Sequence, residues 1–327
     1  MTTSKTESFL NLDPHLILEC VEKHGFRATG ELLQLNSYEN RVFDVRLEPG
    51  TDQPASLIAK FYRPNRWSES TLLDEHLFEQ ELKNEGLSVA VPYSLKNNST
   101  RTDSTVDQIN GIYYTFFEKI RGRLLQEITP NEFLKIGRWM AQLHNIGETQ
   151  TAQHRPTLGP SADDKWALLE NMYPYVAPEV RDTYFDLAED LFQQLDHQLT
   201  DAKYLRIHGD LHRGNILESP EGFVVVDFDD FVNGPAIQDV WMLMPDENFL
   251  ETPEFESLVT GYQELRHFPK HELKLIPFLR AYRMISYAGW ILNRWSDPSF
   301  PRIFPEFGTY KYWAEQTENI KKIAYTL

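Results

Sequence analysis

Two neighbouring segments of the chain contain the residue types that phosphoryl transfer requires: LRIHGDLHRGNIL at 205–217 and FVVVDFDD at 223–230. Asp210 stands five positions before Asn215, and Asp227 ends an apolar run. Transfer to a hydroxyl needs a carboxylate that takes or orients the proton, and oxygen ligands that hold Mg²⁺ against the phosphates. The interval D-x-x-x-x-N is that of kinase catalytic loops. We therefore interpret these three residues as candidates for phosphoryl transfer.

Each candidate also has an ordinary structural explanation when it is taken alone. Asp after Gly is common in turns, and Asn beside Gly is common in left-handed backbone positions. His208 and His212 of the same segment are spaced as i and i+4, but no third ligand of a zinc site stands near them in the sequence. We interpret both histidines as structural. The case for catalysis depends on the combination with two charged residues earlier in the chain.

Lys60 and Glu75 are the charged residues that the expected elements would bury. In the alternating strand segment 56–62 the apolar residues share one face, so Lys60 projects from the other. In the helical pattern 70–85, Glu75 falls on the apolar side. A charge is costly to bury alone, so each of the two needs the other or a ligand. Glu79, one helical turn further on, is a weaker candidate for the same pair.

The remaining elements follow from turn and periodicity signals. Asp13-Pro14 opens a short amphipathic helix, and alternation at 41–47 indicates a strand beside 56–62. The aromatic and β-branched run 112–120 indicates a buried strand. From Thr129-Pro130 onward the spacing is mostly helical.

We place a lobe boundary at Arg121-Gly122-Arg123, where the strand pattern breaks. The predicted fold class is α+β. A small β-rich N-terminal lobe (1–120) would bind a nucleotide, and a larger, mainly helical C-terminal lobe (121–327) would hold the catalytic and substrate groups.

Composition and charge exclude several classes of function. The chain has 32 basic and 49 acidic residues, a formal charge of −17, so nucleic acid is not an expected partner. The most apolar late stretch, 276–295, is interrupted by three arginines, so no membrane partner is expected. The single Cys20 cannot form an internal disulfide and is expected to be a buried apolar side chain in a reducing compartment. We expect a cytoplasmic protein.

The order of these motifs resembles a branch of the protein-kinase-like superfamily. Lys60, Glu75, HGDLHRGN (208–215) and VDFD (226–229) follow one another as in aminoglycoside-phosphotransferase-like enzymes, where H-G-D replaces H-R-D. Five longer stretches look like the bacterial stress response kinase A family, also called the YihE or RdoA protein kinases: LNSYENRVF, KFYRPNRW, HRPTLG, GPAIQDVWML and RWSDPSFPRIFP. The resemblance extends over nearly the whole chain.

The resemblance implies a bilobal protein-kinase-like fold and Mg²⁺- and ATP-dependent phosphorylation of serine or threonine in protein substrates. It also implies autophosphorylation and a role in protecting bacteria from stress-induced death. Asp210 would be the proton acceptor, and Asn215 and Asp227 the magnesium ligands, with Asp227 also counted as catalytic. The other residues implied to contact the nucleotide are Ser37 at the ATP phosphates, the ion pair of Lys60 and Glu75 at the α- and β-phosphates, and Phe117, Glu118 and Ile120 at the end of the strand 112–120.

The sequence departs from the protein-kinase pattern at two places. The expected phosphate loop NSYEN (36–40) contains no Gly, so short polar side chains and exposed amides must replace the open backbone of a glycine-rich loop. D-F-G becomes Asp227-Phe228-Asp229, and no A-P-E segment follows, so control by a phosphorylated activation loop is not expected. Asp239 is expected to brace the backbone of the catalytic loop, or else to cap the helix that follows.

Other interpretations stay open from the sequence. Arg283, Asn293 and Arg294, in an aromatic-rich segment, either face a substrate or cover apolar surface. A small-molecule hydroxyl kinase, of the aminoglycoside, choline or homoserine kinase type, would share the catalytic loop, and the acidic charge would suit a cationic substrate. An ATP-binding pseudokinase is the third possibility, but every catalytic position is present.

Overall fold

The chain forms two compact units in the computed structural model, which describes residues 9–326 apart from residues 11, 51, 97–103, 126–127 and 245–247. The first unit comprises Met1–Ile128, Gln153–Arg155 and His212–Asp230. The second comprises Thr129–Ala152, Pro156–Leu211 and Phe231–Leu327. Two later segments thus join the N-terminal part, and they bring Arg155, Asn215 and Asp227 into one unit with Lys60 and Glu75. The functional boundary expected after residue 120 stays a prediction.

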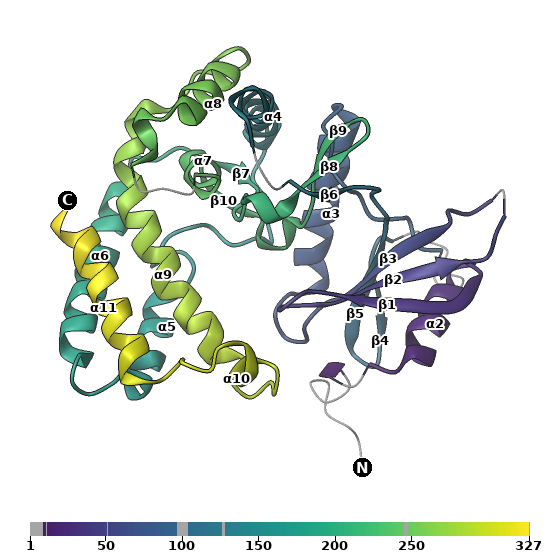
Figure 1. Cartoon of the computed structure of the whole chain (residues 1–327), viewed down its shortest axis with the longest axis horizontal. Helices are drawn as coiled ribbons and strands as arrows, with labels where there is room; N and C mark the ends of the chain where they lie inside the picture. Colours follow the sequence, from purple (N-terminus) through teal and green to yellow (C-terminus); the bar gives the residue numbers. More distant parts are fainter. Residues whose placement is uncertain are drawn as a thin grey trace. The chain divides into compact units, whose positions relative to one another are not determined.

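The first unit is built on an antiparallel sheet with the strand order β1-β2-β3-β5-β4 (Figure 1). The elements of this unit are α2 (Pro14–Lys23), β1 (Ala28–Leu35), β2 (Arg41–Leu47), β3 (Ser56–Phe61), α3 (Glu69–Asn84), β4 (Asp107–Ile109), β5 (Ile112–Glu118), β6 (Arg123–Leu124), η2 (Arg213–Asn215), β8 (Ile216–Ser219), β9 (Gly222–Val225) and η3 (Phe228–Asp230). Strands β6, β8 and β9 form a second, three-stranded sheet. The strands and the helix expected at 41–47, 56–62 and 70–85 are confirmed as β2, β3 and α3.

The two faces of the large sheet differ in what covers them. Leu57, Ala59 and Phe61 of β3 lie in a buried apolar cluster that also includes Ile17 and Cys20 of α2. Helix α2 therefore packs on this face. Cys20 is buried, as expected from the sequence, and burial raises the pKa of its thiol to about 12.

The opposite face of the sheet carries Lys60. The pairing register aligns Val42 of β2, Lys60 of β3 and Thr115 of β5 across three strands. Because side chains alternate along a strand, Lys60 points away from the α2 side, as the sequence predicts. Helix α3 approaches this face, and Ser68 caps its start by accepting a hydrogen bond from the amide of Thr71 at 3.2 Å.

The second unit is mainly helical. Its elements are α4 (Pro130–Gly147), α5 (Lys165–Met172), η1 (Tyr173–Tyr175), α6 (Arg181–Leu199), β7 (Tyr204–Ile207), β10 (Val232–Pro235), α7 (Ile237–Met242), η4 (Phe249–Glu251), α8 (Pro253–Gln263), η5 (Lys270–Leu275), α9 (Ile276–Asn293), α10 (Phe300–Ile303) and α11 (Tyr310–Tyr325). Thr129 and Glu132 form a capping box at the start of α4, as the Thr-Pro signal predicts. The expected α+β class is confirmed.

Close helix contacts and a short ribbon shape this second unit. Helix α4 packs tightly on α8. A Cβ atom at Gly261 would lie only 1.9 Å from the carbonyl oxygen of Leu134, so the contact requires glycine at this position. Helices α6, α9 and α11 lie side by side (Figure 1). Strands β7 and β10 pair antiparallel, and β7 leads directly into the HGD segment.

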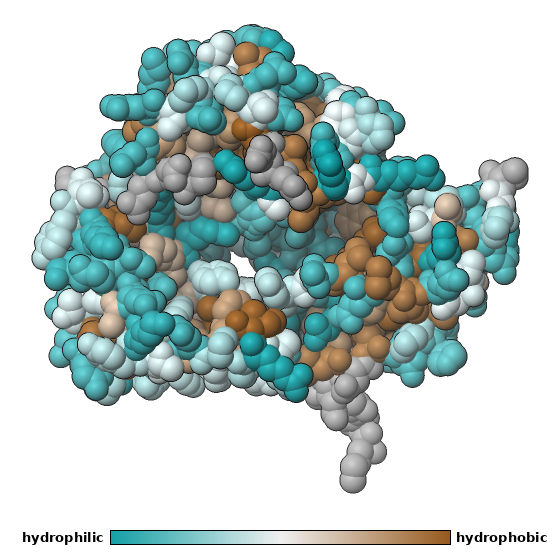
Figure 2. Space-filling model, in the orientation of Figure 1, coloured by the Kyte–Doolittle hydropathy of each residue, from teal (hydrophilic) through white to brown (hydrophobic). Residues whose placement is uncertain are grey.

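The first unit exposes apolar side chains on part of its surface. Figure 2 shows apolar residues gathered over strands β1 to β3 on the visible side of the first unit. Leu33 of β1 is one of the exposed large apolar residues. Among the described helices, none has the length and apolar character needed to cross a bilayer.

Candidate active site

Lys60 is the centre of a buried cluster of charges in the first unit. Its Nζ atom lies 3.0 Å from Asp227 Oδ1, 3.3 Å from Asp229 Oδ1 and 3.8 Å from Glu75 Oε1. Lys60 is only 7% exposed, and Glu75 is fully buried. The structure thus brings a strand residue, a helix residue and the VDFD segment together, and the ion pair predicted from the facing of Lys60 and Glu75 forms.

Glu79 lies beside Glu75 but has a different role. Among the described residues, no ion pair joins Glu79 to a cation, and its Oε2 atom is buried without a hydrogen bond. Burial, together with the neighbouring carboxylate of Glu75, raises the pKa of Glu79 well above its usual range. Burial raises the pKa of Glu75 only to about 7, because Lys60 opposes the shift. Because Lys60 lies 3.8 Å from Glu75, Glu75 is the partner of Lys60.

The two glutamates and the intervening His76 offer ligand-type atoms within 4.8 Å of one another. Both ring nitrogens of His76 are already used, at 3.0 Å from the Tyr62 hydroxyl and 2.7 Å from the Thr105 hydroxyl. Burial lowers the pKa of His76 to about 3, so its ring is neutral. Basic side chains already balance Glu75, and we interpret this group as structural packing behind the ion pair.

Arg155 fixes Glu75 to the VDFD segment, a role that the sequence does not reveal. Its guanidinium lies 3.4 Å from Glu75 Oε2 and donates to the carbonyl oxygens of Phe228 at 3.3 Å and Asp229 at 2.6 Å. The same guanidinium lies over the ring of Trp67, 4.6 Å from its centroid. Arg155 belongs to the HRPTLG stretch, which has no helical or strand periodicity, so a single sequence gives no facing argument for it.

Asp229 occupies the place of the DFG glycine and ties the VDFD segment to the phosphate loop. Its carboxylate accepts a hydrogen bond from Asn40 Nδ2 at 3.1 Å and is ion-paired with Arg66. Burial opposes ionisation here, but Arg66 and Lys60 hold the pKa of Asp229 well below its usual range. Asn40 is the last residue of NSYEN, and its amide donates to Ser37 Oγ at 3.3 Å. The expected ATP-contacting Ser37 therefore lies on a loop that buried polar groups anchor.

Asn215 and Asp227 lie at the same end of the β8–β9 hairpin. The amide of Val226, next to Asp227, donates to the carbonyl oxygen of Asn215 at 3.0 Å. Asp227 has a left-handed backbone (φ 65°), which is strained for a residue with a side chain and marks functional positions. Its side chain is about half exposed (53%). A carboxylate and an amide oxygen are the ligands that Mg²⁺ takes, so the two residues fit a magnesium ion.

The sheet face around Lys60 also offers apolar surface. The register places Leu35 beside Val42, and Ile58 beside Phe117, on the side of the sheet that carries Lys60. Leu35, Val42 and Ile58 are half-buried. A flat apolar base fits such a surface, and of these residues only Phe117 was expected at the nucleotide.

Of the other two expected nucleotide contacts, Glu118 is exposed at the end of β5, opposite Leu57. Ile120 lies two residues beyond the strand and is half-buried. Neither residue takes part in the cluster of charges, so their contact with a nucleotide stays a prediction.

The second unit holds Asp210 and the groups that support it. Asp239 on α7 accepts hydrogen bonds from the amides of His208 at 2.9 Å and Gly209 at 2.8 Å, so the expected brace of the catalytic loop is confirmed. Behind the brace, His144 Nε2 lies 3.3 Å from Asp239. The amide of Asp210 donates to His208 Nδ1 at 3.3 Å, in keeping with a structural histidine. His212, in the first unit, likewise accepts from the amide of Gly214 at 2.9 Å.

Arg283 of α9 forms an ion pair with Asp210, with Nη2 2.7 Å from Oδ1. The sequence offered three polar residues of this region as candidates for a substrate-facing role. Arg294 instead lies over the ring of Trp290 at 5.0 Å, and Asn293 is exposed at the helix end. Arg283 is thus the one of the three that reaches the expected proton acceptor.

Comparison with known proteins decides the family. The model of the phosphotransferase enzyme family (APH) matches residues 31–276. Stress response kinase A of Escherichia coli strain K12 is 33% identical over 313 residues, which cover 95% of this chain and 92% of that protein. The chain belongs to the stress response kinase A family. The serine/threonine protein kinase RdoA of Salmonella typhimurium is 32% identical over 318 residues, with the same two coverages, 95% and 92%.

Solved structures show the fold. Amicoumacin kinase hAmiN, in complex with AMP-PNP, Ca²⁺ and Ami, has a TM-score of 0.73 at 19% identity and covers 98% of this chain and 96% of its own. A microcompartment-associated aminopropanol kinase has a TM-score of 0.66 at 19% identity, with coverages of 95% and 94%. The expected kinase-like fold is confirmed. As a member of its family, the chain is a phosphotransferase of the kinase type.

Proposed function

We propose that the protein is an ATP- and Mg²⁺-dependent serine/threonine protein kinase that phosphorylates itself and other proteins in the cytoplasm during the bacterial stress response. The observation that carries the chemistry is the buried cluster in which Lys60 meets Glu75 and Asp227. The names of the two relatives, stress response kinase A and serine/threonine protein kinase RdoA, support the biological role and the substrate class. Neither nucleic acid nor a membrane is part of this proposal.

The residues of the first unit would bind and orient the nucleotide. Lys60 donates to phosphate oxygens, and Glu75 holds the ammonium group in place. Ser37 and the amides of its loop contact the terminal phosphates, and the apolar face at Val42 and Ile58 covers the base. Asn215 and Asp227 would hold Mg²⁺, which neutralises charge on the phosphates when it is bound. Ser37, Asn215 and Asp227 lie in loops or at element ends, whereas Lys60 and Glu75 lie within β3 and α3.

Asp210 would accept or orient the proton of the attacking serine or threonine hydroxyl. Two hydrogen bonds to Asp239 fix the backbone just before it, which lowers the cost of holding the carboxylate in a reactive position. Arg283, at 2.7 Å, holds the Asp210 carboxylate in place by an ion pair. We therefore assign Arg283 as a positioning residue for Asp210.

A small-molecule hydroxyl kinase is the second candidate function. It is favoured by the names of the solved structures of similar fold, which include an amicoumacin kinase and an aminopropanol kinase. At 19% identity these structures speak for the fold, whereas relatives at 32–33% identity over almost the whole chain carry protein kinase or stress response kinase names. We place the protein kinase first for that reason.

Incubation of the purified protein with γ-labelled ATP and Mg²⁺ distinguishes the candidates. Label on the protein itself, and on added protein substrates, supports the proposal. Label that appears only on an added aminoglycoside, amino alcohol or sugar would replace it with the second candidate. Nucleotide binding without any transfer would indicate a pseudokinase. Asp210→Asn is the matched control, because it removes the proton acceptor without touching the groups assigned to the phosphates.

A further inference from the structure

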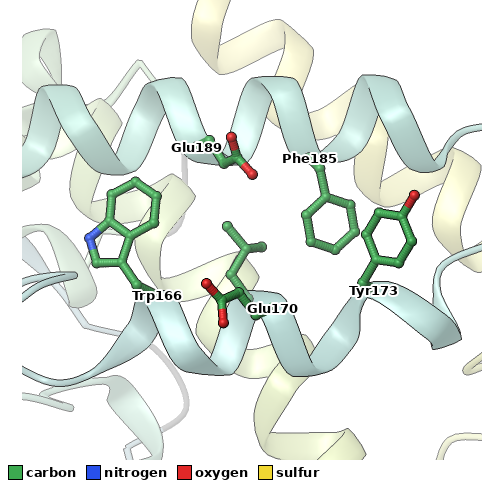
Figure 3. Close-up of a pocket in the computed structure, with 6 residues that line it drawn as sticks. Trp166, Glu170, Tyr173, Phe185 and Glu189 are labelled. Atoms are coloured by element: carbon green, nitrogen blue, oxygen red, sulfur yellow. The ribbon is translucent and has the colours of Figure 1, made fainter.

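A cavity of about 260 Å³ opens between two helical segments of the second unit (Figure 3). One wall comes from α5 and η1, and the other from α6. The lining consists of three aromatic rings, one leucine and two glutamates: Trp166, Leu169, Glu170, Tyr173, Phe185 and Glu189. None of the residues assigned above to phosphoryl transfer belongs to this lining.

The sequence places these side chains on facing surfaces. Trp166, Glu170 and Tyr173 are spaced as i, i+4 and i+7, and therefore share one face of a helical segment. Phe185 and Glu189 are spaced as i and i+4 on α6. Figure 3 shows Glu189 and Phe185 on one helix and Trp166, Glu170 and Tyr173 on the facing segment, with Trp166 at one end of the space and Tyr173 and Phe185 at the other.

Ring contacts at both ends hold the cavity open. The ring centroids of Tyr173 and Phe185 lie 5.1 Å apart, and the rings of Trp166 and Phe192 meet edge-on with their centroids 5.5 Å apart. The indole Nε1 of Trp166 also donates to Ser161 Oγ at 3.2 Å and to Asp196 at 3.1 Å. The orientation of this ring is therefore fixed by its own hydrogen bonds, and the lining is preorganised.

The two glutamates of the lining carry its negative charge. Within the described part of the chain, neither the Glu170 nor the Glu189 carboxylate takes part in an ion pair or a hydrogen bond, and both residues are exposed. Arg181 lies over the ring of Tyr173 at 4.9 Å, but its guanidinium donates to the carbonyl oxygen of Val176 and is not part of the lining. The two glutamates give the aromatic lining a negative charge that complements a cation.

We infer that this cavity binds a lysine side chain of the protein substrate, an inference that rests on the proposed protein kinase function. Aromatic faces attract an ammonium group, and they also pack against the methylene stem of lysine. The two glutamates then provide acceptors for a compact charge with rotatable donors. A volume of about 260 Å³ is below the usual range of small-molecule sites, about 300–1,000 Å³, and suits one side chain.

The first test measures binding to the full-length protein by NMR or calorimetric titration with Nα-acetyl-lysine methylamide. Nα-acetyl-norleucine methylamide has a similar stem without the charge and serves as the ligand control. We expect the lysine compound to bind more tightly than the norleucine compound, and to lose about tenfold in affinity in Glu170→Gln/Glu189→Gln. Asp186→Asn/Asp190→Asn removes the same charge from α6 outside the lining and should bind lysine as the wild type does.

Three results would overturn the inference: no binding of the lysine compound to the wild type, equal affinity for the norleucine compound, or equal losses in the two double variants. A second measurement connects the cavity to the substrate, with a serine peptide that contains one lysine and that the wild type phosphorylates. The glutamate double variant should raise KM for this peptide about tenfold with kcat unchanged. If the wild type phosphorylates no peptide or protein, the proposed function fails, while the titration still decides whether the cavity binds lysine.

Discussion

Replacement of Arg155 by Met tests the buried connection between Glu75 and the VDFD segment. Met has a similar reach but provides neither a charge nor a donor. Loss of one partner of a buried ion pair costs about 3–5 kcal/mol, and a carbonyl left without a donor adds about 1–3 kcal/mol. In this variant Glu75 still has Lys60 at 3.8 Å. Because the pKa of Glu75 is raised to about 7, Glu75 can also take up a proton instead of staying charged, which limits the loss of stability. We therefore expect the free energy of unfolding to fall by ~4 kcal/mol, the lower end of the two losses together.

The control for this change is Arg123→Met. Arg123 pairs with Glu218 at 2.7 Å, but the two side chains are 80% and 42% exposed, so its loss should cost no more than ~1 kcal/mol. Urea unfolding gives both stabilities, and steady-state kinetics with ATP gives kcat. A displacement of Asp227 of the order of 1 Å should lower kcat about 100-fold in Arg155→Met. The reasoning would be refuted if the two variants unfolded at the same urea concentration, or if a folded Arg155→Met kept the kcat of the wild type.

Three further predictions concern the reacting groups and the pH dependence. Asp210→Asn should lower kcat at least 100-fold and leave nucleotide affinity within about twofold, measured by equilibrium binding, because the carboxylate acts on the acceptor hydroxyl; a large loss of nucleotide affinity would count against this role. Asp227→Asn, which tolerates the left-handed backbone, should raise the Mg²⁺ concentration needed for half-maximal activity more than Asn215→Ala does, since a carboxylate is the stronger ligand; the reverse order in a Mg²⁺ titration would contradict the assignment. Because burial raises the pKa of Glu75 to about 7, kcat/KM for ATP should rise as the pH increases through about 7 and Glu75 ionises. The free energy of unfolding has the opposite pH dependence. The folded state still holds the proton that Glu75 in the unfolded chain loses near pH 4.5, so the free energy of unfolding falls as the pH rises from about 4.5 to 7. Glu75→Gln should remove both the activity effect and the stability effect.

Much of the candidate site could be predicted from the sequence because strand and helix periodicities fix which side chains face each other. The alternation around Lys60 and the helical position of Glu75 were sufficient to predict their ion pair, which the structure shows. Asp239 could be predicted as a brace because it follows a glycine-containing segment after the VDFD motif. The spacing of Asp210 and Asn215 likewise depends on local chain geometry alone.

Other parts of the site depend on contacts between segments that no periodicity connects. Arg155 comes from an irregular stretch, yet it donates to backbone carbonyls more than seventy residues away in the chain. Asn40 and Arg66 meet Asp229 in the same way, through side chains whose direction a loop sequence does not determine. The apolar surface beside Lys60 follows from the pairing register of β1, β2 and β3, which alternation within a single strand does not determine. Side-chain direction in loops and long-range register are therefore the two features that required the structure.

A double-mutant cycle on Lys60 and Glu75 tests the central claim most directly, namely that the buried cluster in the first unit carries phosphoryl transfer. The measurement is kcat/KM for ATP in Lys60→Met, Glu75→Gln and the double variant. Lys60 contacts both Asp227 (3.0 Å) and Glu75 (3.8 Å), so Lys60→Met should lower kcat/KM more than Glu75→Gln does. Residues that act as a unit are non-additive, and the double variant should be little worse than Lys60→Met alone. Strict additivity of the two losses, or a wild-type kcat/KM in either single variant, would contradict the account.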